Sequence, residues 1–236
     1  MTDRSGTPGR FITLEGPEGG GKTTQARRLA DLLEAHDFEA VLTREPGGTV
    51  IGERIRELLL DDGLASQLGA RTDALLFNAA RTQLVDEVIA PSLGRGAVVV
   101  ATRFADSTLA YQGFGSGLPL ADLRVLERFT LGALRPDLTI VLDLPVEAGL
   151  ARKTQGEMTR FEIGFDLAFH ERVRKGFLSL AAAEPGRFAV VDALGEPDGV
   201  AEEIAKVVAR LPGLEALAST PRTNGEPSTL AGRIHR

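Results

Sequence analysis

The chain has 236 residues, 43% hydrophobic and 25% charged, which is typical of one globular domain with a buried core. It contains no cysteine, which excludes a disulfide framework and a thiolate metal site and suits a cytoplasmic enzyme. A net charge of -6 argues against broad nucleic-acid binding, and no apolar run approaches the roughly 20 residues that cross a bilayer. We therefore expect neither a nucleic-acid nor a membrane partner.

Short apolar runs bounded by turn residues recur along the chain, at 11–16, 38–43, 97–101, 138–144 and 188–192. They are rich in valine and isoleucine and do not alternate with polar residues, which is typical of parallel strands buried on both faces. Apolar residues at helical spacing lie between them, at 26–33, 165–180 and 200–211. This alternation predicts an α/β fold with right-handed crossovers.

The two ends of the chain differ from its centre. Residues 1–9 and 213–236 carry Pro, Gly, Ser and Thr and lack sustained apolar periodicity, so we expect mobile tails there. No linker rich in Pro, Gly or Ser divides the middle of the chain. Residues 10–212 should therefore form a single domain.

The segment GPEGGGKT, residues 16–23, matches the pattern G-x-x-x-x-G-K-[ST] and stands between a predicted strand and a predicted helix. Its glycines allow backbone N–H groups to converge on phosphate oxygens, and the helix dipole adds to the attraction. Lys22 would meet the terminal phosphates, and the Thr23 hydroxyl would ligate Mg²⁺. The motif predicts an Mg-nucleotide site, although switches, motors and small-molecule kinases share it.

Three further segments narrow the function: TREPGGT at 43–49, LLFNAARTQ at 75–83 and TRFADSTLAYQ at 102–112. The first and third follow predicted strands. Because loops after parallel strands meet at one edge of the sheet, both should face the glycine loop. This places Arg44 and Arg103 beside the phosphates of the donor.

With these segments in this order, residues 10–211 resemble the bacterial thymidylate kinases. The resemblance implies transfer of the γ-phosphoryl group of ATP to dTMP, with Mg²⁺, giving dTDP and ADP. It also implies a P-loop fold with a five-stranded parallel sheet, helices on both faces, a lid and a homodimer. The ATP-binding residues that it implies are Gly16, Pro17, Glu18, Gly19, Gly20, Gly21, Lys22, Thr23 and Thr24, with Thr23 also on the metal.

The resemblance also assigns the acceptor site, residue by residue. Glu18 would lie near the sugar 3′-hydroxyl, and Arg44 and Arg103 around the dTMP phosphate. Phe77 would stack on thymine while Arg81 bonds its carbonyl edge. The remaining implied substrate-binding residues are Ser107 and Gln112, for polar recognition, and Tyr111, packed where a ribose 2′-hydroxyl would clash.

Each of these roles has a structural alternative. Glu18 could be a solvated loop carboxylate, and Phe77 a core residue of its helix. Arg81 could pair with a surface acid, and Tyr111 could serve packing alone. Asp143, at the end of the fourth strand, fits a magnesium-associated acid and a strand-end cap equally well.

The segment GLARKTQGEMTRFE, residues 149–162, resembles the lid of the family. In the bacterial branch of this family whose glycine loop lacks an arginine, as this one does, the resemblance implies that basic lid residues stabilise the transition state, and the candidates are Arg152, Lys153 and Arg160. Lys22, Glu18 and Arg103 are the other predicted catalytic residues. A phosphate monoester has its second pKa at about 6 and is itself the nucleophile, so no general base is needed. The three histidines lie outside these motifs.

Two features depart from the family pattern. Thr102 stands where an aspartate usually precedes Arg103, and a hydroxyl cannot supply that negative charge near Mg²⁺. The lid also looks short. The alternatives are therefore a degenerate nucleotide-binding paralogue and a kinase of another pyrimidine monophosphate; a GTPase switch predicts an N-K-x-D segment, which the sequence lacks.

Overall fold

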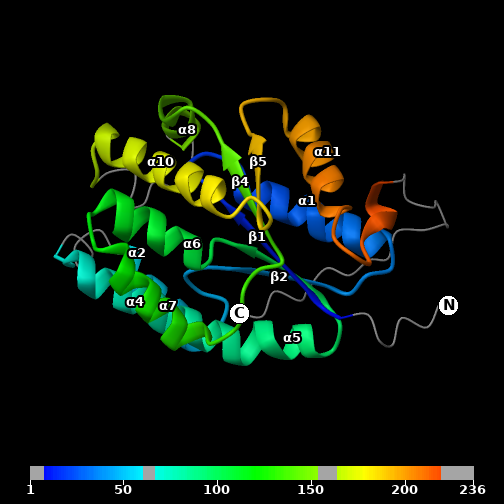
Figure 1. The fold of residues 1–236 in the computed structure, drawn as a ribbon, viewed down its shortest axis with the longest axis horizontal. Coiled ribbons are helices and arrows are strands. Elements are labelled where there is room, and N and C mark those ends of the chain that lie inside the picture. The colour runs from blue at the N-terminus through cyan, green and yellow to red at the C-terminus, as the bar shows by residue number, and fades with distance from the viewer. Residues whose placement is uncertain (1–7, 61–66, 154–163, 219–236) are drawn as a thin grey trace.

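The computed structural model describes residues 8–60, 67–153 and 164–218. Within them, five parallel strands form one sheet in the order β2-β3-β1-β4-β5 (Figure 1). The strands are β1 (Arg10–Glu15), β2 (Ala40–Arg44), β3 (Val98–Thr102), β4 (Leu138–Asp143) and β5 (Phe188–Asp192). The predicted five-stranded parallel α/β fold is confirmed, and every strand lies on one of the apolar runs.

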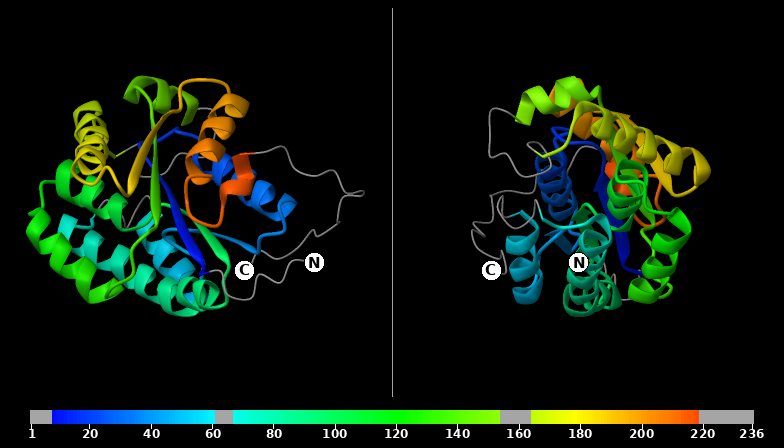
Figure 2. Two further views of the ribbon diagram at one scale, coloured as in Figure 1. Left: turned by 45° about the vertical axis from the view of Figure 1, so that its right-hand side comes forward. Right: turned by 90° about the vertical axis from the view of Figure 1, so that its left-hand side faces the viewer.

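Side chains of the strands alternate between two core layers, because successive residues of a strand point to opposite faces. Ile12 and Leu14 of β1 pack on the face covered by α1 (Lys22–Ala35), α11 (Pro197–Val208) and η3 (Glu215–Ala218). Phe11 and Val99 point the other way. In Figures 1 and 2, α1 and α11 lie side by side on their face of the sheet.

The opposite face of the sheet carries more helices, and their apolar residues form two further core clusters. These elements are α2 (Val50–Leu60), α4 (Ala70–Leu84), η1 (Val85–Ile89), α5 (Ala90–Gly94), α6 (Ala105–Thr108), η2 (Leu109–Gly115), α7 (Leu120–Leu131) and α10 (Leu167–Ala183). A further helix, α8 (Val146–Lys153), follows β4. Because all strands are parallel, the loops after β1, β2, β3 and β4 open on the same edge.

The end of the domain differs from expectation. Residues 213–218 are packed rather than part of a tail, since Leu214 and Leu217 are buried in the core beside α1 and α11. Two leucines after Pro212 are too few to show periodicity in the sequence. Of the expected tails at 1–9 and 213–236, residues 1–7 and 219–236 lie outside the described residues, as do lid residues 154–162. Lid residues 149–153 belong to α8. In the described parts of the chain, no helix is long and apolar enough to cross a membrane.

Candidate active site

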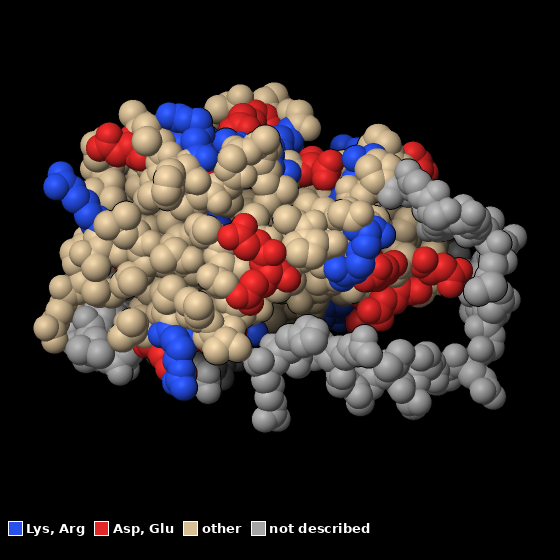
Figure 3. Space-filling model, turned by 90° about the horizontal axis from the view of Figure 1, so that it is seen from below, with Lys and Arg blue, Asp and Glu red and all other residues tan. Residues whose placement is uncertain are grey.

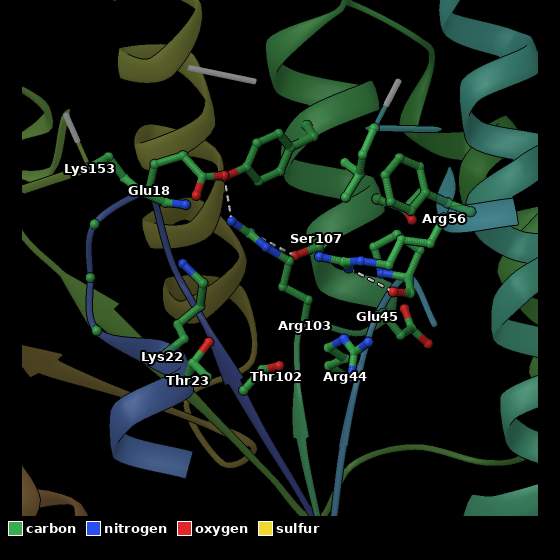
Figure 4. Close-up of a pocket in the computed structure, with 18 of the residues that line it drawn as sticks. Glu18, Lys22, Thr23, Arg44, Glu45, Arg56, Thr102, Arg103, Ser107 and Lys153 are labelled. Carbon is green, nitrogen blue, oxygen red and sulfur yellow. Dashed lines mark hydrogen bonds and ion pairs between the residues drawn. The ribbon is translucent and has the colours of Figure 1, made fainter. Parts of the chain in front are cut away.

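A cavity of about 380 Å³ opens at the carboxyl edge of the sheet, where the glycine loop meets the β2–α2 and β3–α6 turns (Figure 4). It brings together most of the predicted site residues. Its described lining consists of Glu18, Gly19, Gly20, Gly21, Lys22, Thr23, Thr24, Arg44, Glu45, Pro46, Arg56, Leu60, Phe77, Thr102, Arg103, Ser107, Thr108, Tyr111, Gln112, Arg152 and Lys153.

The glycine loop curls around the amine of Lys22. Lys22 Nζ donates hydrogen bonds to the carbonyl oxygens of Gly16, at 3.0 Å, and Pro17, at 2.6 Å. Gly16 has a φ of 127°, and a Cβ there would meet the Leu142 carbonyl oxygen at 2.5 Å, so only glycine fits. Burial, together with nearby Arg103, lowers the pKa of Lys22 to about 7. The carbonyl oxygens of Gly16 and Pro17, two residues outside the described lining of the cavity, thus fix the position of the Lys22 amine.

The glycine loop also packs directly on α8 through two glycines. A Cβ at Gly19, which has a φ of 71°, would meet the Gly149 carbonyl oxygen at 2.0 Å, and a Cβ at Gly149 would meet the Glu18 carbonyl oxygen at 2.2 Å. Both clashes involve backbone atoms, which cannot rotate away as a side chain can. The conformation of the loop therefore depends on the position of α8.

We expect Gly149→Ala to lower kcat/KM for ATP by about tenfold or more, because the added methyl displaces the phosphate-binding loop, and misplacement by about 1 Å can cost a hundredfold in rate. Steady-state kinetics with varied ATP would measure the change. Gly199→Ala is the matched control, since a Cβ at this glycine of α11 meets open space. Equal kcat/KM values in the two variants would show that α8 does not support the loop.

Positive charge converges on the opposite wall of the cavity. Arg103 Nη2 contacts Glu18 Oε1 at 2.5 Å, and Arg44 Nη2 contacts Glu53 Oε1 at 2.9 Å. Burial alone would raise the pKa of Glu18, but Arg103 and Lys22 lower it to about 2. Glu18 is therefore a buried, ionised carboxylate and not a solvated one, and it is too weak a base for proton abstraction at neutral pH.

Sequence reasoning did not find Arg56, a third arginine at this wall. Its Nη1 donates to the Pro46 carbonyl oxygen at 2.8 Å, and burial and nearby Arg44 lower its pKa. The signal was present: Gly52, Arg56 and Leu59 share one helical stripe, whose first and last members are buried. An arginine on the inward stripe of α2 indicates an anion-binding role.

The remaining predicted acceptor residues lie around these arginines. The Tyr111 hydroxyl donates to Glu18 Oε1 at 2.7 Å, and the Arg103 guanidinium lies over the Tyr111 ring at 4.9 Å. Gln112 Nε2 donates to Asp73 Oδ2 at 2.9 Å, while half-buried Phe77 forms part of the wall. The cavity therefore has a cationic end and an aromatic, amide-bearing end.

Arg81 takes a different place from the one expected. Its side chain is 1% exposed and is absent from the described lining of the cavity. Its Nε and Nη2 contact the Glu45 carboxylate at 2.8 and 2.7 Å, and Nη2 also bonds the Phe104 carbonyl oxygen and the Thr108 hydroxyl. It thus pairs with an acid, as the structural alternative held, but with a buried acid that lines the cavity.

The predicted lid residues divide between inside and outside the described chain. Arg152 donates to the carbonyl oxygens of Ala193 and Leu194, both at 2.8 Å, and so ties α8 to the loop after β5. Arg160 lies outside the described residues. Asp143 forms a forked ion pair with Arg174 of α10, at 2.8 and 2.9 Å, so its carboxylate is held away from a magnesium role.

Comparisons with known proteins agree on one family. A model of the thymidylate kinase family matches residues 14–204. The thymidylate kinase of Pseudomonas fluorescens strain SBW25 is 56% identical over 186 residues, 78% of this chain and 88% of that protein. That of Caulobacter vibrioides is 49% identical over 209 residues, 88% of this chain and 100% of that protein.

A solved structure gives the same result for the fold. The crystal structure of thymidylate kinase from Ehrlichia chaffeensis superposes with a TM-score of 0.70 at 33% identity, and the match covers 85% of this chain and 98% of that one. The family model, the sequence relatives and this structure all extend over most of the domain that holds the cavity. This chain belongs to the thymidylate kinase family.

Proposed function

We propose that the protein transfers the γ-phosphoryl group of ATP to dTMP, giving dTDP and ADP. The observation that carries the proposal is one cavity that joins a phosphate-binding glycine loop to a second anion site made by Arg44, Arg56 and Arg103. A switch or motor needs only the first site. A second, cationic site facing the first is what a phosphorylated acceptor requires.

The reaction is a transfer between two phosphates. An oxygen of the dianionic acceptor attacks the γ-phosphorus, the new P–O bond forms, the bond to the β,γ-bridging oxygen breaks, and ADP leaves with that electron pair. Lys22 exchanges its bonds to Gly16 and Pro17 for phosphate oxygens, and Arg103 adds positive charge from the other side. The chain's own contribution is positioning and charge, without a general base.

Magnesium would be held by the Thr23 hydroxyl together with phosphate oxygens and water, a donor set that suits its preference for oxygen and retained water. When bound, the ion neutralises charge on the transferring phosphates. Thr102, 8% exposed at the end of β3, lines the same region and adds no negative charge. Within the described parts of the chain, no cluster of three acidic or histidine side chains offers a different metal site.

For the acceptor, Phe77 stacks on the base, and Gln112 and Ser107 supply polar contacts. Glu18 meets the sugar 3′-hydroxyl, and Tyr111, held against Glu18, closes the space that a 2′-hydroxyl needs. Arg81 acts indirectly in this proposal, by holding Glu45 in the wall of the cavity.

The direct test is a coupled ADP-release assay with Mg-ATP and dTMP, dUMP, UMP, dCMP or dGMP as acceptor, on the native protein and on Thr102→Asp. Turnover strongest on dTMP supports the proposal. Strongest turnover on dUMP or dCMP would make it a kinase of another pyrimidine monophosphate. Release of ADP no faster than with ATP alone, restored on dTMP by Thr102→Asp, would identify a degenerate paralogue.

We expect Arg56→Met to raise the KM for dTMP by about 10- to 100-fold while leaving the KM for ATP within about twofold, because a charge-assisted phosphate contact is worth about 1.5–3 kcal/mol. Initial rates with each substrate varied in turn would measure this. Arg54→Met is a matched control from the same helix, because the Arg54 side chain is 77% exposed and forms an ion pair with Glu57, one turn further along the helix. An unchanged KM for dTMP would remove Arg56 from the acceptor site.

We also propose a homodimer that buries the outer faces of α4 and α7. Phe129 is 87% exposed, and Val125 and Leu75 are 57% and 58% exposed. Seen from below in Figure 3, the side on which α4 and α7 lie carries few charged side chains over a broad area. Exposed apolar surface of this kind marks an interface, and a two-fold pairing of identical faces would cover it.

Phe129→Asp should convert the dimer to a monomer, because pairing would bury two carboxylates against an apolar face. Sedimentation equilibrium would give the mass of each species. Glu202→Gln, on the far α11 face, should leave the mass unchanged. A native protein that sediments as a monomer at high concentration would contradict the proposed dimer.

A further inference from the structure

One buried acid beside the active site has no role in the reaction described above. Glu15 ends β1, immediately before the glycine loop, and its side chain is fully buried. It is outside the described lining of the cavity, so it touches neither substrate in the proposed reaction. A buried carboxylate is unfavourable unless it is hydrogen-bonded, and its partners therefore indicate its purpose.

Within the described chain, the hydrogen bonds of the Glu15 side chain all run to Phe104 and Ser107, in the turn after β3 and the short helix α6 that follows it. Its Oε1 accepts from the backbone N–H groups of Phe104, at 2.7 Å, and Ser107, at 3.2 Å. Its Oε2 accepts from the Ser107 hydroxyl at 2.6 Å. Three donors of this turn and helix are thus gathered on a side chain 89 to 92 positions earlier in the chain.

This turn carries Arg103 in a conformation that needs support. Arg103 has a φ of 66°, in the left-handed region that residues other than glycine seldom adopt and that costs on the order of 1 kcal/mol. On its N-terminal side it is held by the bond from its N–H to the Leu14 carbonyl oxygen, at 3.0 Å. On its C-terminal side the next N–H, that of Phe104, is held by Glu15.

The same contacts reach the guanidinium. Ser107, whose hydroxyl donates to Glu15, lies 3.3 Å from Arg103 Nη1 and accepts its hydrogen bond. Figure 4 shows the Arg103 side chain running into the centre of the cavity with Ser107 beside it. Glu15 therefore acts on both the backbone and the side chain of Arg103.

We propose that Glu15 is a positioning residue for phosphate recognition, whose buried carboxylate holds Arg103 in the strained conformation that aims its guanidinium at the acceptor phosphate. The inference rests on the proposed function only in naming the acceptor. The restraint on Arg103 stands on the geometry of the turn.

The energetics of Glu15 agree with a functional role. Burial, with the nearby charge of Asp106, raises its pKa to about 7, although Ser107, Arg103 and the Phe104 N–H act in the opposite direction. Lys22 of α1 also interacts electrostatically with Glu15. Since the folded protein holds this proton more tightly than the unfolded chain does, stability is lost as pH rises from about 4.5 to about 7. The carboxylate destabilises the fold at neutral pH, as functional groups often do.

The test compares Glu15→Gln with the native protein. Glutamine keeps the shape and still accepts from both N–H groups, but it removes the charge. Isothermal titration at pH 8 should show the Kd for dTMP rising about tenfold, in line with a weakened charge-assisted contact. The unfolding temperature of Glu15→Gln, relative to that of the native protein, should rise between pH 5.5 and pH 8, because the variant lacks the ionisation that destabilises the native fold. Crystal structures of both proteins should show Arg103 displaced in the variant.

Thr139→Val is the matched control. Thr139 is also fully buried, and its hydroxyl bonds Asp106 and Thr13 and accepts a hydrogen bond from Arg187, in a neighbouring polar network. It should lower the unfolding temperature and leave the Kd for dTMP within about twofold. A larger Kd in Thr139→Val than in Glu15→Gln would show general destabilisation and overturn the proposal.

Two other results are decisive. An unchanged Kd and an unmoved Arg103 in Glu15→Gln would make Glu15 a purely structural residue. If the native protein does not bind dTMP at all, the proposed function fails, and the position of Arg103 in the two crystal structures still decides the role of Glu15.

Discussion

Replacing Lys22 with methionine is expected to lower kcat by about 10³-fold or more while leaving the Kd for dTMP within about threefold of the native value. Loss of a single preorganised group that stabilises developing charge typically costs about 10²–10³ in rate, and Lys22 also faces the donor's terminal phosphates. Methionine suits the site because Lys22 is 9% exposed and lies along the loop as an unbranched chain. Single-turnover phosphoryl transfer would measure the step itself.

A control variant and a binding measurement accompany this prediction. Lys206→Met removes a lysine that is 60% exposed and paired with Glu203 on α11, so its kcat should match that of the native protein. Binding of dTMP to Lys22→Met, measured by titration calorimetry, should show that the acceptor site is intact. A variant that keeps more than about a tenth of native kcat would mean that Lys22 contributes less than one such contact.

Arg81→Met is expected to lower the free energy of unfolding by about 3–5 kcal/mol. The substitution leaves the Glu45 carboxylate, itself only 3% exposed, without the guanidinium that neutralises it, and an uncompensated buried charge is strongly destabilising. Burial already raises the pKa of Glu45 against the opposing effect of Arg81. Urea denaturation followed by circular dichroism would give the change.

The double variant Arg81→Met/Glu45→Gln should recover much of the lost stability, because no buried charge remains unpaired. Arg71→Met, at an exposed position of the same helix, should change stability by less than about 0.5 kcal/mol. Arg81→Met could instead keep native stability and lose discrimination between dTMP and dCMP. That result would show that Arg81 recognises thymine directly.

The phosphate-binding loop, the strands and the family could all be predicted from the amino-acid sequence. The loop is eight consecutive residues whose function depends on local backbone freedom and on the adjoining helix, so the segment is sufficient to predict it. The central strands β1, β3 and β4 were evident because both of their faces are buried, which leaves unbroken apolar runs. The edge strands β2 and β5 are partly exposed, with Leu42 and Val190 open to solvent, and there the expected burial on both faces is wrong. The motifs around Phe77, Arg103 and Tyr111 are also short local segments. They carry the resemblance to the family, and through it they predicted the acceptor.

The pairing of charged groups that lie far apart along the chain could not be predicted from the sequence. Arg81 and Glu45 are 36 positions apart, and Glu15 and Phe104 are 89 apart. Nothing in the composition of either segment specifies such a pairing, because it depends on which strands become neighbours. Arg56, unlike Arg54, shares a helical stripe with Gly52 and Leu59, but only the packing of α2 shows that this stripe faces the cavity. The contact of Gly19 with Gly149 likewise exists only once the strand order brings α8 over the loop, since close backbone approach is a property of the assembled fold.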